Sequence, residues 1–240
     1  MTLNLHGVVR AGHPLPDPAR FDVRLVVWED LAVVVSALHR DRDVAEQDAA
    51  QQLGMLSEMV QRGPVVPLRW GTVAEDDESA RTEVVRPVAP HLRSELERLD
   101  GLVEFHVYLQ FDEETAMQAV AGERGGWGGR PAAALTDRVK AGEAIARRVV
   151  AWRRARSDDL LKPLNRYAQD VETLEDGDHL VERRAFLVRQ ENVPAASRAV
   201  AAIAAEDVDS RVVAPLPAFS FLRDVSKTSD DRDRASRWGW

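Results

Sequence analysis

Cysteine is absent from this sequence of 240 residues. Without thiols the chain cannot build a disulfide framework, a thiolate metal site or a cysteine nucleophile. Long apolar runs are absent too, because no segment approaches the roughly 18 consecutive apolar residues of a membrane-spanning helix. The opening residues MTLNLHGVVRAGHPLP lack the basic start, apolar run and small-residue cleavage site of a secretion signal. We therefore expect a cytoplasmic protein without a membrane segment.

Basic residues are outnumbered. The chain carries 32 lysines and arginines against 40 aspartates and glutamates, for a formal net charge of −8. Proteins that bind nucleic acid by neutralising its phosphates usually carry a clear basic excess, so we expect no nucleic-acid partner. Hydrophobic residues make up 45% of the chain, which is typical of a globular protein of one or two domains.

Motifs of catalysis and cofactor binding are also missing. The sequence has no GxGxxG fingerprint, no P-loop, no GxSxG elbow and no HExxH pair. Its six histidines are scattered singly, and none has a second histidine at the i,i+4 spacing of a helical metal site. We assign no catalytic residue, no cofactor and no metal ligand, and expect a protein that is not an enzyme.

Hydrophobic periodicity predicts an α+β fold. Alternating apolar residues favour a strand at Leu3–Val9, and two β-branched runs, Val23–Trp28 and Leu31–Leu38, favour a tight hairpin. Helical spacing then predicts an amphipathic helix over Val44–Val60. Its expected core face consists of Ala49, Leu53, Leu56 and Val60.

Proline marks the middle of the N-terminal half. Pro64–Val73 has strand character but contains Pro67, which predicts a sheet edge or a bulge there. The acidic run Glu75–Ser79 suits the first turn of a helix, which Pro87 and Pro90 should kink or split.

The clearest strand is Val103–Phe111, where apolar residues alternate with polar ones over nine residues. Glu104, His106 and Tyr108 lie on its polar face, and three titratable groups on one face can form a general acid–base site. The alternative is that a half-exposed strand face simply carries polar residues.

A glycine-rich segment predicts the domain boundary. GERGGWGG has five glycines in eight residues, so we expect a linker at residues 122–131 between an α+β domain at 1–121 and a second at 132–225. Residues 226–240 mix both charges with little to bury, which predicts a flexible tail.

The second domain is expected to begin with helices. Apolar spacing predicts a long helix toward Arg156 and a second helix over Asp158–Leu174, followed by a β-α-β pattern. Its last strand is Arg211–Leu222, in which Phe219 and Phe221 would be core residues.

Two surface features leave alternatives open. Asp137–Lys162 carries eight bases and four acids, a local charge of +4 that suits either a docking surface for an acidic partner or a solvated helix face. Trp238 and Trp240 in the tail are either interface anchors or side chains that fold back on their own domain.

Three motifs occur in order along the chain. Pro64–Val84 reads PVVPLRWGTVAEDDESARTEV, Leu96–Val107 reads LERLDGLVEFHV, and Ala214–Leu222 reads APLPAFSFL. Together they resemble the GvpL/GvpF family of gas vesicle proteins. The first is similar to the family's Pro-x-Arg-Phe-Gly-Thr-Val signature with its acidic helix, the second to a later stretch of the family, and the third to its closing motif. The likeness covers about residues 1–224. Trp70 stands where the family usually has Phe, and His106 and Tyr108 stand where it often has Gly and Lys.

The resemblance implies a non-enzymatic accessory protein with two domains of modified ferredoxin-like topology. It implies binding to the small, very hydrophobic shell protein GvpA and to other Gvp proteins during nucleation and assembly of the gas vesicle, without a cofactor. The candidate partner-binding residues are Arg69, Trp70, Thr72, Glu104, His106, Tyr108, Trp238 and Trp240.

Two further expectations compete with this assignment. Arg69, if buried, would need a carboxylate, and Glu104 is the obvious choice, which would make both residues structural. The rival function is a small-molecule-binding regulator or enzyme with a site in the cleft between the two domains, near Glu104, His106 and Tyr108. That reading requires a polar pocket with perturbed titratable groups, whereas an assembly protein should offer an apolar or edge-strand surface.

Overall fold

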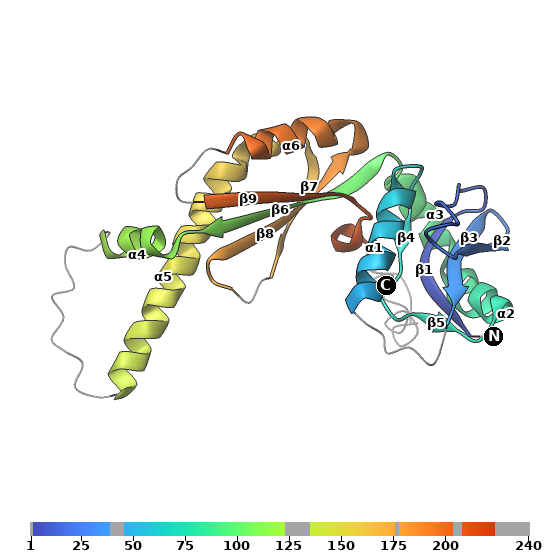
Figure 1. Ribbon diagram of the computed structural model, residues 1–240, viewed down its shortest axis with the longest axis horizontal. Coiled ribbons are helices and arrows are strands. Elements are labelled where there is room, and N and C mark those ends of the chain that lie inside the picture. Colours follow the sequence, from blue (N-terminus) through green and yellow to red (C-terminus); the bar gives the residue numbers. More distant parts are fainter. Residues whose placement is uncertain (1, 39–45, 123–134, 176–177, 204–207, 224–240) are drawn as a thin grey trace. The chain divides into compact units, whose positions relative to one another are not determined.

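The computed structural model describes residues 2–38, 46–122, 135–175, 178–203 and 208–223 (Figure 1). These residues form an α+β protein with two sheets, as the sequence predicts. The chain divides into two compact units. Unit 1 takes its described residues from Met1–Glu104, Leu187–Glu191 and Ala214–Trp240, and unit 2 from Phe105–Phe186 and Asn192–Val213.

Unit 1 contains a five-stranded antiparallel sheet. Its strands are β1 (Leu3–Arg10), β2 (Arg24–Trp28), β3 (Leu31–Ala37), β4 (Val66–Pro67) and β5 (Val73–Ala74). The order is β2-β3-β1-β4, and β5 also pairs with β1. The predicted hairpin joins β2 to β3, and the strand containing proline lies at the sheet edge, as expected.

Helices cover this sheet. They are α1 (Glu46–Val60), α2 (Asp77–Ser79), the π-helical η1 (Ala80–Val85), the 3-10 helix η2 (Arg86–Val88) and α3 (Ala89–Arg98). Five consecutive residues of β3, Leu31 to Val35, are buried, so side chains on both faces of the sheet are covered. The run from α2 to α3 is irregular at Pro87 and Pro90, where each proline removes a backbone donor.

The core face of α1 is rotated from the expected one. Leu56 and Val60 are buried as predicted, but Leu53 is 37% exposed, and Gln52 and Met55 are buried. The expected face was wrong because it followed the apolar residues alone, whereas Gln52 has a polar partner beneath the helix.

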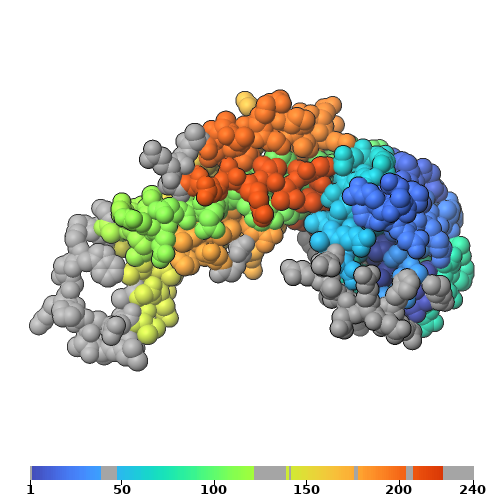
Figure 2. Space-filling model, in the orientation of Figure 1, coloured from blue at the N-terminus to red at the C-terminus, as the bar shows by residue number. Residues whose placement is uncertain are grey.

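Unit 2 contains a four-stranded sheet of order β7-β8-β6-β9. The strands are β6 (Leu102–Phe111), β7 (Ala168–Leu174), β8 (Val181–Arg189) and β9 (Val208–Leu216). Its helices are α4 (Glu113–Gly122), α5 (Leu135–Leu161) and α6 (Val193–Ala201), with the short 3-10 turn η3 (Lys162–Leu164). The 3-10 turn η4 (Gln190–Asn192) spans a boundary between the two units along the chain, and η5 (Phe219–Phe221) belongs to unit 1. The space-filling view shows β9 uncovered at the surface, as an edge strand should be (Figure 2).

Both sheets follow the ferredoxin-like pattern. Numbered within its own unit, each sheet places its strands in the order second, third, first, fourth. Unit 2 has helices in both crossovers, whereas in unit 1 the connection from β1 to β2 is a proline-containing loop. The topology is therefore ferredoxin-like in unit 2 and modified in unit 1.

The units divide the chain differently from the expected domains at 1–121 and 132–225. β6 is the neighbour of β8 and β9, so most of it belongs with the C-terminal half, and residues from Ala214 onward return to unit 1. Of the expected linker 122–131, the structure describes Gly122 alone. The expected tail at 226–240 also lies outside the described residues.

Two expectations for the C-terminal half were wrong. Pro163 ends the long helix, and Ala168–Leu174 forms β7 rather than the end of a second helix. β7 is an edge strand with nearly every side chain exposed, so it lacks the apolar alternation that identifies a strand. The last strand ends at Leu216, and Phe219 lies in η5 with 41% exposure, while Phe221 is buried.

Candidate functional site

The edge of the unit 1 sheet is interrupted. β4 pairs with Gly7 and Val8 of β1, and β5 pairs with Leu3 and Asn4. The chain leaves the edge between these two short strands and returns after a tight turn at residues 69–72.

Hydrogen bonds fix the ends of this turn, which we call the edge turn. Leu68 N donates to His6 O at 3.0 Å, and Leu5 N donates to Thr72 O at 2.9 Å. Thr72 closes the turn by donating from its backbone N and from Oγ1 to Arg69 O, at 3.1 and 2.6 Å. Gly71 has a φ of 81°, a left-handed conformation that a side chain disfavours. The signature residues Arg69 to Thr72 therefore form a turn of defined conformation at the sheet edge.

A bulge in β1 lies opposite the edge turn. The pairing of β1 with β3 shifts register between Leu5 and Gly7, so His6 is the extra residue. Its ring is buried, with Nδ1 2.7 Å from Gln52 Oε1 and Nε2 2.9 Å from Ser36 Oγ. With Gln52 Oε1 as an acceptor, Nδ1 donates and Nε2 accepts from the Ser36 hydroxyl. Burial lowers the pKa of His6, so the imidazole is neutral at pH 7.

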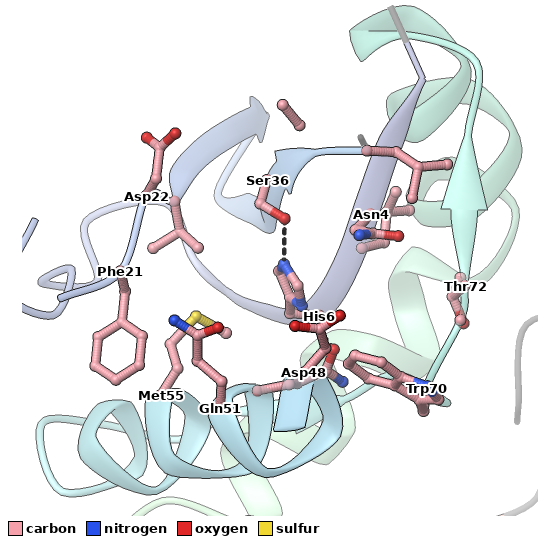
Figure 3. Close-up of a pocket in the computed structure, with 16 residues that line it drawn as sticks. Asn4, His6, Phe21, Asp22, Ser36, Asp48, Gln51, Met55, Trp70 and Thr72 are labelled. Carbon is pink, nitrogen blue, oxygen red and sulfur yellow. Dashed lines mark hydrogen bonds between the residues drawn. The ribbon is translucent and has the colours of Figure 1, made fainter. Parts of the chain in front are cut away.

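A pocket of about 280 Å³ lies beside this histidine (Figure 3). Strands, a loop, a helix and the edge turn contribute to it. Its polar and aromatic lining residues are Asn4, His6, Phe21, Asp22, Ser36, Asp48, Gln51, Gln52, Trp70 and Thr72, and Met55 lines it from α1. Residues far apart in the sequence thus converge on one site within unit 1.

The pocket combines carboxylates with an aromatic rim. Asp48 is half-buried, Asp22 is exposed, and Trp70 is 39% exposed. In Figure 3, Trp70 and Asp48 stand toward one end of the pocket and Phe21 and Asp22 toward the other. The described lining residues include two aspartates and neither lysine nor arginine.

The predicted site residues do not meet in one place. Trp70 and Thr72 line the pocket, and Arg69 lies next to them with its side chain exposed. Glu104 has no exposed surface, and its two carboxylate oxygens accept hydrogen bonds from Ser220, from N at 2.8 Å and from Oγ at 2.7 Å. The expected pairing of a buried Arg69 with Glu104 is therefore wrong, because Arg69 is exposed and Ser220 supplies the donors. Glu104 has a structural role.

His106 and Tyr108 lie in unit 2. Both are partly buried on β6, with ring centroids 6.3 Å apart. The guanidinium carbons of Arg183 and Arg211, from the two neighbouring strands, lie 5.1 and 4.5 Å from the Tyr108 ring centroid. This polar strand face is thus packed with cations, and neither His106 nor Tyr108 is among the described residues that line the pocket. Trp238 and Trp240 fall outside the described residues.

The basic region lies on α5. Lys140, Arg147 and Arg154 are exposed at a spacing of seven residues, but Arg153 is buried and its Nε lies 2.9 Å from Glu182 Oε2. Glu182 also pairs with Arg184 at 2.9 Å. Part of the positive charge therefore holds α5 to β8, and the exposed part stays a prediction for docking.

Sequence reasoning missed the polar core of the pocket. His6 is a buried polar residue of β1, and Gln52 sits on the buried face of α1, which are the two signals that a buried polar pair exists. Neither signal indicates the other residue, because 46 positions separate them.

Within the described ranges, no three or more His, Cys, Asp or Glu side chains are placed to hold a metal ion. No helix in those ranges is both long and apolar enough to cross a membrane.

The family comparison covers nearly the whole chain. The family described as gas vesicle synthesis protein GvpL/GvpF matches residues 5–223. A relative called gas vesicle protein F, from Streptomyces sp. (strain CB03234), is 27% identical over 241 residues, which cover 92% of this chain and 100% of the relative.

Solved structures share the fold. The crystal structure of gas vesicle protein GvpF from Microcystis aeruginosa has a TM-score of 0.75 at 19% identity, over 92% of this chain and 99% of that chain. The crystal structure of GvpF from Anabaena sp. PCC7120 has a TM-score of 0.74 at 18% identity, over 92% and 96%. At these identities the likeness shows the fold alone.

Proposed function

Because the chain belongs to the GvpL/GvpF family of gas vesicle synthesis proteins, we propose that it is an accessory protein of gas vesicle assembly. In this role it binds the shell protein GvpA and other Gvp proteins and assists nucleation without catalysing a reaction. The protein would act in the cytoplasm and at the forming vesicle. The observation that carries the proposal is the family match over residues 5–223.

The interrupted edge of unit 1 supports a binding role. β4 and β5 have two residues each; Trp70 between them is 39% exposed, and Val73 within β5 is 40% exposed. An edge strand presents unpaired backbone N–H and C=O groups, and an extended segment of another protein can add to such an edge. A very hydrophobic shell subunit needs a partner that covers its apolar surface before it enters the shell.

Pull-down of GvpA from the same source tests the proposal. The full chain should capture co-expressed GvpA, and W70A/V73A should capture at least fivefold less. Val27→Ala is the matched control, because Val27 is 46% exposed on β2 at the opposite edge of the same sheet. Circular dichroism would verify that each variant is folded.

The possible results test the contact surface and the assembly function separately. Loss of capture in both W70A/V73A and Val27→Ala would contradict the edge as the contact. No capture of GvpA or of any other vesicle component by the folded full chain would overturn the assembly role.

The rival function is a small-molecule-binding regulator, and the pocket is the observation that favours it. Its volume of about 280 Å³ is close to the lower end of the range of about 300–1,000 Å³ for ligand sites. It lies within unit 1 and is not lined by Glu104, His106 or Tyr108. A ligand screen by thermal shift discriminates the two, because a regulator should be stabilised by one metabolite and an assembly protein by GvpA.

A further inference from the structure

The pocket of unit 1 contains polar groups that the fold does not use. Within the described chain, the side chains of Asn4, Asp22, Asp48 and Gln51 have no hydrogen-bond or ion-pair partner, although all four line the pocket. By contrast, His6 has both ring nitrogens engaged. We propose that this pocket receives an arginine side chain of a partner protein. The identity of the partner rests on the proposed function, whereas the choice of arginine rests on the chemistry of the pocket.

Charge selects a cation. Among the described residues of the lining, Asp22 and Asp48 are the charged groups, and none is a lysine or arginine. His6 contributes no positive charge, because burial lowers the pKa of its ring. A carboxylate or phosphate ligand would meet two like charges, whereas a cation gains charge-assisted hydrogen bonds from them.

Shape selects a flat cation on an apolar stem. Trp70 offers an indole face at the rim, where a guanidinium can stack. Met55 and Phe21 are 2% and 8% exposed and form apolar walls that suit the methylene groups of the side chain. Asn4 and Gln51 add amide oxygens that accept hydrogen bonds. The volume suits one side chain rather than an extended ligand.

Arginine matches this donor pattern better than lysine. A guanidinium has five N–H donors in a rigid plane, so it can reach a carboxylate and an amide oxygen while its face stays on the indole. An ammonium is a compact point charge that stacks less well. We therefore expect an arginine side chain to bind in the pocket more tightly than a lysine side chain.

Titration of the ¹⁵N-labelled full chain with small peptides tests it. The probe is acetyl-Gly-Arg-Gly-amide, and its matched control is the same peptide with citrulline, which keeps the shape and loses the charge. The readout is the indole N–H signal of Trp70, identified by its absence in Trp70→Phe. The arginine peptide should move this signal with at least tenfold higher affinity than the citrulline peptide, and the lysine peptide should be weaker than arginine.

Charge-neutral variants locate the effect. D22N/D48N removes both negative charges and keeps the shapes of the side chains, so it should weaken binding of the arginine peptide at least tenfold. Glu97→Gln removes one negative charge from an exposed position on α3 and should bind like the wild type. Equal binding of the arginine and citrulline peptides, or full binding by D22N/D48N, would overturn the proposal.

Two further measurements distinguish this proposal from an internal occupant of the pocket and from the proposed function. The segment at residues 39–45 contains Arg40 and Arg42 and lies outside the described residues, so the titration is repeated with R40Q/R42Q. Binding that appears only in this variant overturns a partner as the occupant. GvpA capture by D22N/D48N distinguishes the proposals, because a wild-type level of capture rejects the arginine pocket while leaving the assembly role intact.

Discussion

His6 shows what one residue requires when it is buried in a strand. A neutral imidazole needs one acceptor and one donor, and Gln52 and Ser36 provide them from two different elements. Because the surroundings disfavour the charged ring, the pKa of His6 is lowered from its ordinary value of 6.5. The stability of unit 1 is therefore coupled to pH.

We expect acid to destabilise unit 1 through His6. Below about pH 6.5 the unfolded chain binds a proton at this histidine that the folded chain does not, so the free energy of unfolding falls as the pH drops through that window. Thermal unfolding followed between pH 7.5 and 5.5 should show a smaller loss of Tm in His6→Gln than in the wild type. His179→Gln changes an exposed histidine and should keep the wild-type slope. An unchanged slope in His6→Gln would contradict the assignment.

Among single elements, the edge turn depends on backbone conformation more than on contacts. Gly71 has no atom within 4 Å of the position that a Cβ would take, so only its φ of 81° restricts the residue. Gly54 in α1 is the opposite case, because a side chain there also meets open space but the helix favours it.

The two glycines should respond with opposite signs. Gly71→Ala should lower the free energy of unfolding by about 1–2 kcal/mol because the left-handed conformation is strained for alanine. Gly54→Ala should raise it by about 0.5–1 kcal/mol because alanine loses less backbone entropy. Urea denaturation measures both, and a stabilising Gly71→Ala would refute the role of the turn.

Elements were predictable where hydrophobic period and turn chemistry agreed. Val103–Phe111 alternates cleanly and forms β6, and Pro67 placed its strand at an edge. β7 was not predictable, because an exposed edge strand has no apolar alternation. The pocket was predictable only through Trp70 and Thr72, since the polar pair of His6 and Gln52 depends on a bulge and a helix rotation that no local pattern encodes.

The molecule as a whole is assembled from interleaved segments. Ser220 and Phe221 come from the C-terminal end, yet Ser220 donates to Glu104, and the Phe221 carbonyl accepts from Arg98 at 2.6 Å. β6 lies between β8 and β9, which are encoded more than seventy residues later. A linear boundary could not be read from glycine content, because pairing partners rather than composition define the units.

Cutting the chain at the glycine-rich segment should therefore not give two folded halves. The fragment 132–225 lacks β6, so β9 loses its neighbour, and we expect no cooperative thermal transition. The fragment 1–121 keeps the unit 1 sheet but leaves the buried Glu104 carboxylate without Ser220, so its Tm should fall. Circular dichroism of each fragment checks this, with the two fragments co-expressed as the control. A cooperative transition in 132–225 alone would contradict it.

The bond between Ser220 and Glu104 also sets an order in time. A ribosome adds roughly 5–20 residues per second, so the 116 positions between them correspond to a delay of about 6–23 s. During that interval the nascent chain exposes an acidic side chain that the finished fold hides. Completion of unit 1 therefore waits until the ribosome has added Ser220.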